Sequence, residues 1–139
     1  MKNVLVSGAS GQLGQAVISH FLKEENQVAG IAGSNKELPF SGHPRYLHYQ
    51  ADLRNETAAA EVVAKLTGKW QRIDVAVLTA GGYAGGKLAG TGSASIHEQL
   101  QLNFDTAYNL ARPLWLQMMT QGYGRLFLIG SRPGLNIEQ

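Results

Sequence analysis

The stretch Val4-Leu5-Val6-Ser7-Gly8-Ala9-Ser10-Gly11-Gln12-Leu13-Gly14 joins a short apolar run to a glycine-rich turn, inside which a helical pattern begins. This order predicts a strand, a phosphate-binding loop and a helix. Gly8 allows a tight turn, Gly11 lets the backbone approach a pyrophosphate, and Gly14 lets the helix lie close to its strand. The spacing is G-x-x-G-x-x-G rather than the commoner G-x-G-x-x-G, so an ordinary glycine turn is the alternative interpretation.

The start of the expected helix favours an anion. The backbone N–H groups of Gln12 and Leu13 would point out of the helix N-terminus, where negative charge is stabilised. The candidate binding residues of this loop are therefore Gly8, Ser10, Gly11, Gln12, Leu13 and Gly14.

Composition narrows the class of protein. The 139 residues are 44% hydrophobic and 16% charged, which predicts a single globular domain over 1–139. The net charge of +2 comes without a basic block, so we expect no nucleic-acid partner. With no cysteine in the chain, a disulfide, a thiolate nucleophile and a Cys-ligated metal are excluded, and we expect no metal site. Neither a signal peptide nor an apolar run of membrane-spanning length is visible, which predicts a cytoplasmic protein without a membrane partner.

Apolar runs and helical patterns alternate along the chain. Strands are expected at 3–7, 27–32, 46–50, 73–79 and 125–129, and helices at about 11–24, 55–68 and 95–121. Such alternation predicts an α/β fold: a Rossmann-type doubly wound parallel sheet between two helical layers. Right-handed crossovers and a glycine loop after the first strand favour the strand order 3-2-1-4-5.

Local signals set the expected helix ends. Leu13, Val17 and Phe21 have helical spacing and are expected to pack. Asn55 is expected to cap the second helix and Gly68 to end it. Ser95, with Glu98 three residues later, forms a capping-box pattern for the last helix. Pro113 should kink that helix or restart it.

The residues at the carboxyl end of the second strand indicate which dinucleotide the loop binds. An acid there takes ribose hydroxyls, whereas small polar or basic groups accept a 2′-phosphate. No acid lies between Val28 and Lys36, and Ser34, Asn35 and Lys36 could hold a phosphate. We therefore expect NADP rather than NAD, with an ordinary polar turn as the alternative.

The expected topology collects distant segments at one sheet edge. The glycine loop 8–14, Asp52, the glycine-rich segment 80–86 and Ser131 each follow a strand. In open parallel sheets, ligands bind at the carboxyl ends of the strands, near the point where the strand order reverses.

Taken together, these residues resemble the short-chain dehydrogenase/reductase family. The resemblance rests on Ser7–Gly14, Ala51-Asp52-Leu53, Ile73-Asp74-Val75 with Ala80-Gly81, Asn103 in the last helix, and Ile129-Gly130-Ser131. It covers essentially the whole chain. Where the family usually has Asn-Asn-Ala-Gly, this chain has Leu78-Thr79-Ala80-Gly81, without the two asparagines. Within the family, segment 80–86 and the glycine spacing look most like the dihydropteridine reductases, which carry an acid after the second strand that this chain lacks.

The resemblance implies roles for individual residues. Asp52 would accept a hydrogen bond from the adenine amino group, and Leu53 would lie beside the ring. Ala80 and Gly81 would pass the adenosine ribose, and Gly82 would bind the cofactor beside them. Asn103 would hold a water of the proton relay, and Ser131 would donate a hydrogen bond to the substrate carbonyl. Asp52, Asn103 and Ser131 could instead be a helix-terminal charge, a backbone-bonded Asn and a turn serine.

The resemblance also implies an oxidoreductase that transfers a hydride between NAD(P) and a small carbonyl or imine substrate. The family's proton donor is the Tyr of a Tyr-x-x-x-Lys pair on the helix after the fifth strand, and no such pair follows the fifth strand in these 139 residues. The one Tyr-x-x-x-Lys spacing in the sequence, from Tyr83 to Lys87, lies in the glycine-rich segment after the fourth strand. One hypothesis is therefore a C-terminally truncated oxidoreductase, inactive as this chain alone. A non-catalytic dinucleotide-binding module or sensor is the alternative, and a flavodoxin-like or response-regulator-like domain is a third.

The last strand would then lack a neighbour. Leu126, Phe127, Leu128 and Ile129 would form an apolar open edge, which favours pairing with another chain. We therefore expect a homo-oligomer that associates through this strand or the last helix.

Overall fold

The computed structural model describes residues 1–131. Along the chain, the elements are β1 (Asn3–Ser7), α1 (Gln12–Lys23), β2 (Gln27–Ala32), β3 (Tyr46–Gln50), α2 (Glu56–Trp70), β4 (Val75–Leu78), a short 3-10 helix (Leu88–Gly90), α3 (Ser93–Leu100), a π-helical segment (Gln101–Asp105), α4 (Thr106–Gln121) and β5 (Arg125–Leu128). All five expected strands are present, although β4 and β5 are shorter than the apolar runs that predicted them.

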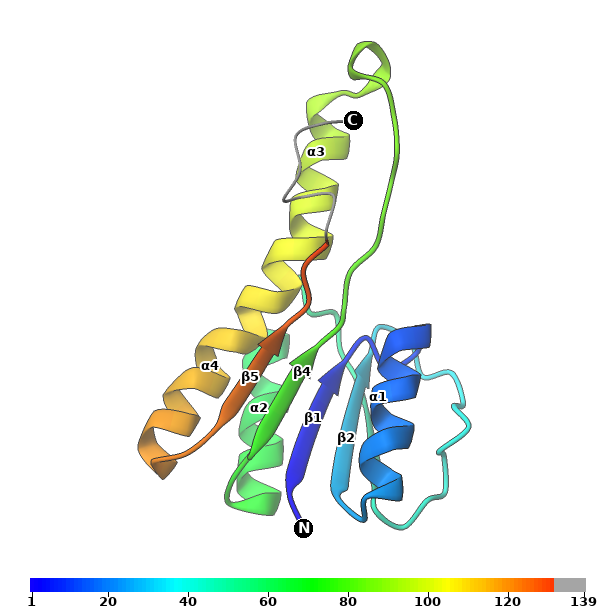
Figure 1. Ribbon diagram of the computed structural model, residues 1–139. Coiled ribbons are helices and arrows are strands. Elements are labelled where there is room, and N and C mark those ends of the chain that lie inside the picture. The colour runs from blue at the N-terminus through cyan, green and yellow to red at the C-terminus, as the bar shows by residue number, and fades with distance from the viewer. Residues whose placement is uncertain (132–139) are drawn as a thin grey trace.

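The strands form one parallel sheet in the order β3-β2-β1-β4-β5, which confirms the predicted topology. The order reverses beside β1, whose Ser7 pairs with Ile31 on one side and Leu78 on the other. Helix α1 covers one face of the sheet, while α2 and α4 cover the other (Figure 1). The carboxyl ends of β1 and β4 therefore meet at the same edge.

Each face of the sheet has its own apolar core. Alternate side chains of β1 point to opposite faces. Val4 and Val6 pack with Ile18 and Leu22 of α1, whereas Leu5 packs in the cluster formed with α2 and α4. Along α1 the buried residues are Gly14, Ile18 and Leu22, so the expectation that Leu13 packs is wrong: its side chain is 49% exposed.

Helix α2 starts as expected and ends later than expected. The Asn55 side chain accepts a hydrogen bond from the Ala58 N–H at 2.9 Å, an N-cap worth about 1 kcal/mol. Gly68 does not end the helix. It lies inside α2, and Gln71 takes the left-handed conformation at the C-terminus, with φ 64°. The side-chain amide of Gln71 donates to the Gly68 carbonyl and so helps to close this end.

The last helical region contains an irregular turn that the sequence pattern did not indicate. Helix α3 starts at Ser93 after Gly92, without a side-chain cap, so the predicted capping box at Ser95 is wrong. Pro113 lies inside α4, which runs from Thr106 to Gln121 as one helix rather than restarting there. The irregularity is the π-helical segment, which contains Asn103.

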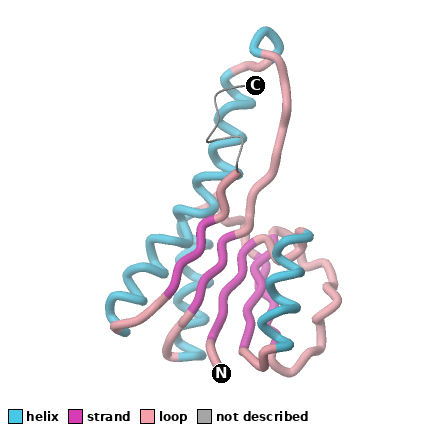
Figure 2. The backbone as a smooth tube through the Cα atoms, in the orientation of Figure 1, coloured by secondary structure: helices cyan, strands magenta, loops and turns pink. Residues whose placement is uncertain are grey.

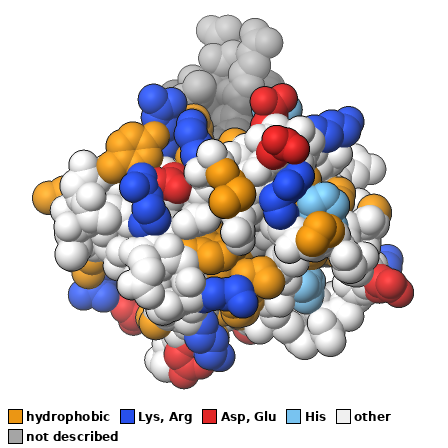
Figure 3. Space-filling view, turned by 90° about the horizontal axis from the view of Figure 1, so that it is seen from below, with side chains coloured by type: hydrophobic (Ala, Val, Ile, Leu, Met, Phe, Trp, Pro, Cys, Tyr) orange, Lys and Arg blue, Asp and Glu red, His pale blue; other side chains and the backbone are white. Residues whose placement is uncertain are grey.

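Helix α3 and the long loop after β4 extend beyond the carboxyl edge of the sheet (Figure 2). Figure 3 looks onto the opposite end, where Lys and Arg side chains are spread among acidic, polar and apolar ones rather than gathered in one block. None of the helices described here has the length and apolar character needed to cross a membrane.

Candidate cofactor-binding site

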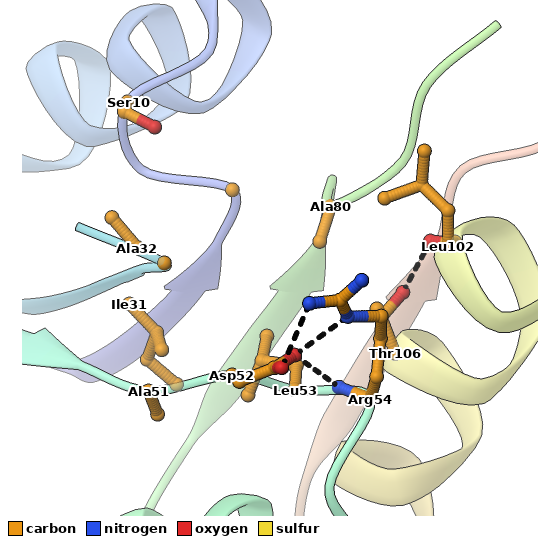
Figure 4. Close-up of a pocket in the computed structure, with 12 residues that line it drawn as sticks. Ser10, Ile31, Ala32, Ala51, Asp52, Leu53, Arg54, Ala80, Leu102 and Thr106 are labelled. Atoms are coloured by element: carbon orange, nitrogen blue, oxygen red, sulfur yellow. Dashed lines mark hydrogen bonds and ion pairs between the residues drawn. The ribbon is translucent and has the colours of Figure 1, made fainter. Parts of the chain in front are cut away.

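A cleft of about 290 Å³ lies at the carboxyl edge, beside the reversal of strand order (Figure 4). The residues that line it come from the ends of four strands and from the π-helical region: Gly8, Ser10, Ile31, Ala32, Gly33, Ala51, Asp52, Leu53, Arg54, Ala80, Leu102 and Thr106. It thus unites five of the predicted binding residues, which are Gly8, Ser10, Asp52, Leu53 and Ala80.

The glycine loop is held tightly against the sheet. Gly8 has φ +66°, and a Cβ there would lie 2.9 Å from the Ala80 nitrogen. The Gly11 N–H donates to the Gly8 carbonyl at 2.9 Å. A Cβ on Gly14 would overlap the Gly8 carbonyl oxygen and lie 2.8 Å from its carbon. The glycine spacing therefore reflects close packing of the backbone between the loop, the start of α1 and the end of β4.

The start of α1 is open at the loop. Gly11 is its N-cap and makes no side-chain cap hydrogen bond. Because the first N–H groups of a helix have no partner within it, those of Gln12 and Leu13 are available to a ligand. The side-chain amide of Gln15 donates to the Ser10 carbonyl at 3.0 Å and fixes the loop from the helix side.

Two hydrogen bonds that the sequence did not reveal join the ends of β1 and β4. The Thr79 hydroxyl donates to the Ser7 carbonyl at 2.6 Å, and the Ala80 N–H donates to the Ser7 hydroxyl at 3.1 Å. Ser7 is 1% exposed. Thr79 and Ser7 thus connect the strand ends at the position where the family's asparagines are missing, and hold Ala80 in the cleft wall.

Asp52 is paired with a residue that the sequence analysis did not single out. The Arg54 backbone N–H and Nε donate to Asp52 Oδ1 at 3.1 and 2.9 Å, and Nη2 donates to Oδ2 at 2.9 Å (Figure 4). These hydrogen bonds lower the pKa of Asp52 and raise that of Arg54. An ionised carboxylate offers about four acceptor positions, so Oδ2 keeps one of them for a further donor. In the sequence, this pair is indicated by the spacing of the two residues, i and i+2.

Asn103 joins the π-helical segment to the loop after β4. Its Oδ1 accepts from the Gly82 N–H at 2.9 Å, and its Nδ2 donates to the Gln99 carbonyl at 3.1 Å. A Cβ on Gly81 would lie 2.8 Å from Asn103 Oδ1, so the loop passes close to the helix here. Asn103 therefore holds the backbone of Gly81 and Gly82 against the π-helical segment.

The remaining predicted residues lie outside the lining of the cleft. Ser34 and Asn35 follow Gly33, which does line it, and both are exposed. Ser131 is exposed beyond β5. No group of three His, Cys, Asp or Glu side chains that could hold a metal ion occurs among residues 1–131.

The family model of the short chain dehydrogenases matches residues 2–138. The chain belongs to this family. It is 32% identical over 105 residues to a cyclohexanol dehydrogenase from Rhodococcus sp., covering 68% of this chain and 36% of that protein. It is 27% identical over 136 residues to the NADP-dependent 3-hydroxy acid dehydrogenase YdfG from Shigella flexneri, covering 94% of this chain and 54% of the relative.

Solved structures show the same fold. ElxO with NADP bound superposes with a TM-score of 0.91 at 25% identity, over 98% of this chain and 58% of that one. This chain thus spans between about a third and somewhat over half of the length of these relatives.

Proposed function

We propose that this chain binds a nicotinamide dinucleotide, preferentially NADP(H), as part of an oxidoreductase that acts on a small carbonyl or imine substrate. The observation that carries the proposal is the cleft at the carboxyl edge, where close-packed backbone at Gly8 and Gly14 meets Asp52 and Ala80. Family membership supports the reaction class. The NADP named with ElxO and with YdfG supports a nicotinamide dinucleotide as the cofactor, and the proposed preference for NADP(H) rests on the residues after β2, which include no acid between Val28 and Lys36.

The adenosine half and the pyrophosphate of a dinucleotide each have suitable groups in or beside this cleft. The N–H groups of Gln12 and Leu13 would bind the pyrophosphate at the start of α1. Asp52 Oδ2 would accept from the adenine amino group, with Leu53 beside the ring. Ala80, Gly81 and Gly82 would border the adenosine ribose, and Ser34 and Asn35 would bind its 2′-phosphate. Bound in this way, the cofactor supplies the hydride.

The chemical step needs a substrate oriented beside the nicotinamide and a proton donor. We propose that Ser131 hydrogen-bonds the substrate carbonyl, and that Asn103 holds a water of the proton relay in addition to positioning the loop. No Tyr-x-x-x-Lys pair follows β5 in the 139 residues, and the one pair with this spacing, Tyr83 and Lys87, lies in the loop between β4 and the 3-10 helix. The proposal for this chain is therefore cofactor binding, and turnover is proposed only for a protein that also supplies the proton donor.

Calorimetric titration with NADPH and with NADH tests the proposal. We expect saturable binding of both at one site per chain, with NADPH the tighter ligand. Absence of heat and of fluorescence change with either dinucleotide would contradict the proposed function.

Asp52→Ala is expected to weaken NADPH and NADH about tenfold each, because the variant loses one hydrogen bond from a ligand to an ionised group. Both affinities should fall equally, since the adenine is common to the two cofactors. Arg54→Ala should weaken both by a smaller factor, because the carboxylate remains but is no longer oriented. Calorimetry measures each constant.

Asp105→Ala is the matched control for Asp52→Ala. Asp105 precedes α4, makes no side-chain cap hydrogen bond and does not line the cleft. If Asp52→Ala binds NADPH and NADH as tightly as Asp105→Ala does, Asp52 is not part of the binding site.

We also propose that the chain associates with itself through β5 or α4. Phe127 and Leu128 are 49% and 62% exposed on β5, an edge strand among the described residues. Trp115 and Met119 are 59% and 65% exposed on α4. Sedimentation at tens of micromolar should show a dimer or a larger species, and Phe127→Lys should shift it towards monomer, because a charge on an edge strand opposes pairing. A monomer in the unmodified chain would disprove this association.

A further inference from the structure

Two polar side chains of the edge strand β3 reach the turn that follows β2. His48 Nε2 lies 3.3 Å from the Ser34 carbonyl oxygen, and Gln50 Nε2 donates to the Gly33 carbonyl at 3.5 Å. His48 and Gln50 are two residues apart in a strand and therefore project from the same face. The successive carbonyls of Gly33 and Ser34 are thus both hydrogen-bonded by side chains from one face of β3.

The hydrogen-bonding role of His48 follows from its partners. A carbonyl oxygen only accepts, so His48 Nε2 carries a hydrogen. In the neutral ring Nδ1 is then an acceptor, and it lies 3.3 Å from the Tyr46 hydroxyl. Burial raises the pKa of Tyr46 to about 12, so the hydroxyl keeps its proton and can donate. Gly30 leaves room for this hydroxyl, which a Cβ there would overlap. Tyr46 therefore orients the ring of His48.

Holding these carbonyls also fixes the direction of two amides. In a trans peptide the N–H points opposite to the C=O of the same unit. The Ser34 N–H and the Asn35 N–H therefore point away from the side-chain nitrogens of His48 and Gln50, and neither has a hydrogen-bond partner within residues 1–131. Gly33 lines the cleft, so the turn begins at its wall.

We propose that His48 and Gln50 are positioning residues that hold turn 33–36 in a conformation able to bind the adenosine 2′-phosphate. The proposal rests on the proposed dinucleotide binding and assigns part of the preference for NADPH to side chains on β3. The phosphate would be bound by the amides of Ser34 and Asn35, with Lys36 adding positive charge. The sequence of the turn alone does not determine this conformation.

His48→Leu and His48→Gln test the proposal in the full chain. Leu removes the donor to Ser34, whereas the Gln amide nitrogen retains one at a similar reach. We expect His48→Leu to weaken NADPH about tenfold while NADH changes less than about twofold, and His48→Gln to recover most of the NADPH affinity. Adenosine 2′,5′-bisphosphate and 5′-AMP, titrated by calorimetry, should show the same split. His20→Leu, an exposed change on α1, is the matched control.

Equal weakening of NADPH and NADH in His48→Leu, or no rescue in His48→Gln, would overturn the inference and leave the proposed dinucleotide binding intact. An unmodified chain that prefers NADH would overturn the inference together with the proposed preference for NADPH, and would leave the proposed dinucleotide binding intact. Binding of neither cofactor would overturn both. Should His48→Leu fail to fold, Gln50→Leu, at an exposed end of β3, carries the same test, with an expected NADPH-selective loss of roughly threefold.

Discussion

Gly14→Ala is expected to abolish measurable binding of NADPH and NADH and to lower the free energy of unfolding by about 1–3 kcal/mol. Gly14 is buried in the first turn of α1, and its Cβ would overlap the carbonyl oxygen of Gly8. The atoms in the way belong to the backbone, so no side chain can rotate to relieve the overlap. Either α1 moves away from β1 or the loop changes shape.

Both responses damage the same site. Moving α1 displaces the N–H groups of Gln12 and Leu13. Reshaping the loop moves Gly8, which has little free space because a Cβ there would lie 2.9 Å from the Ala80 nitrogen. Calorimetric titration measures the loss of binding, and urea denaturation measures the loss of stability.

Gly68→Ala is the control for this prediction because it makes the same chemical change in another helix. Gly68 is exposed inside α2, and a Cβ there would meet nothing within 4 Å. Replacing a helical glycine should stabilise the protein by roughly 0.5–1 kcal/mol and leave binding unchanged. If Gly14→Ala binds NADPH as tightly as Gly68→Ala does, the close packing of the loop is not needed for the site.

The topology was predictable because it depends on features that are local in sequence. Each strand is a short apolar run, and the crossovers from β1 to β2, from β3 to β4 and from β4 to β5 each contain a helical pattern, whereas the one from β2 to β3 contains no helix. The rule that such crossovers are right-handed then leaves few strand orders. The same reasoning placed Gly8, Asp52 and Ala80 at one edge, where the structure has them.

Helix ends were less predictable, because competing residues can serve as caps. Gly68 and Ser95 both fit common end signals, yet α2 continues to Trp70 and α3 has already begun at Ser93. The π-helical segment has no simple residue pattern. It accompanies a tertiary contact, the hydrogen bond between Asn103 and Gly82, which spans 21 residues of sequence.

Pairings inside the site were also hidden from the sequence. The bond between Thr79 and Ser7 joins residues 72 apart and depends on the register of β1 and β4. The pairing of Arg54 with Asp52 depends on the side-chain conformation that the chain adopts after β3. Sequence spacing can bring such residues to one edge, but it does not determine which donor meets which acceptor.

Leu114→Ala is expected to lower the free energy of unfolding by about 2–5 kcal/mol, from the lost burial and the cavity left behind. Leu114 is 0% exposed and lies between α4 and the sheet, in the core that also contains Leu110 and Leu66 of α2. A domain of this size has about 5–15 kcal/mol in total, so this one change removes a large part of it. Thr106 begins the same helix and lines the cleft, so a loosened α4 should also weaken NADPH binding.

Leu116→Ala separates burial from helix propensity, because it makes the same substitution two residues further along α4. Leu116 is 56% exposed, so its truncation should change the free energy of unfolding by less than about 0.5 kcal/mol. Urea denaturation with matched m-values compares the two variants. Equal stabilities would show that α4 does not pack against the sheet through Leu114. A large difference, together with weaker NADPH binding in Leu114→Ala alone, would show that the cleft depends on how firmly α4 is anchored on the sheet.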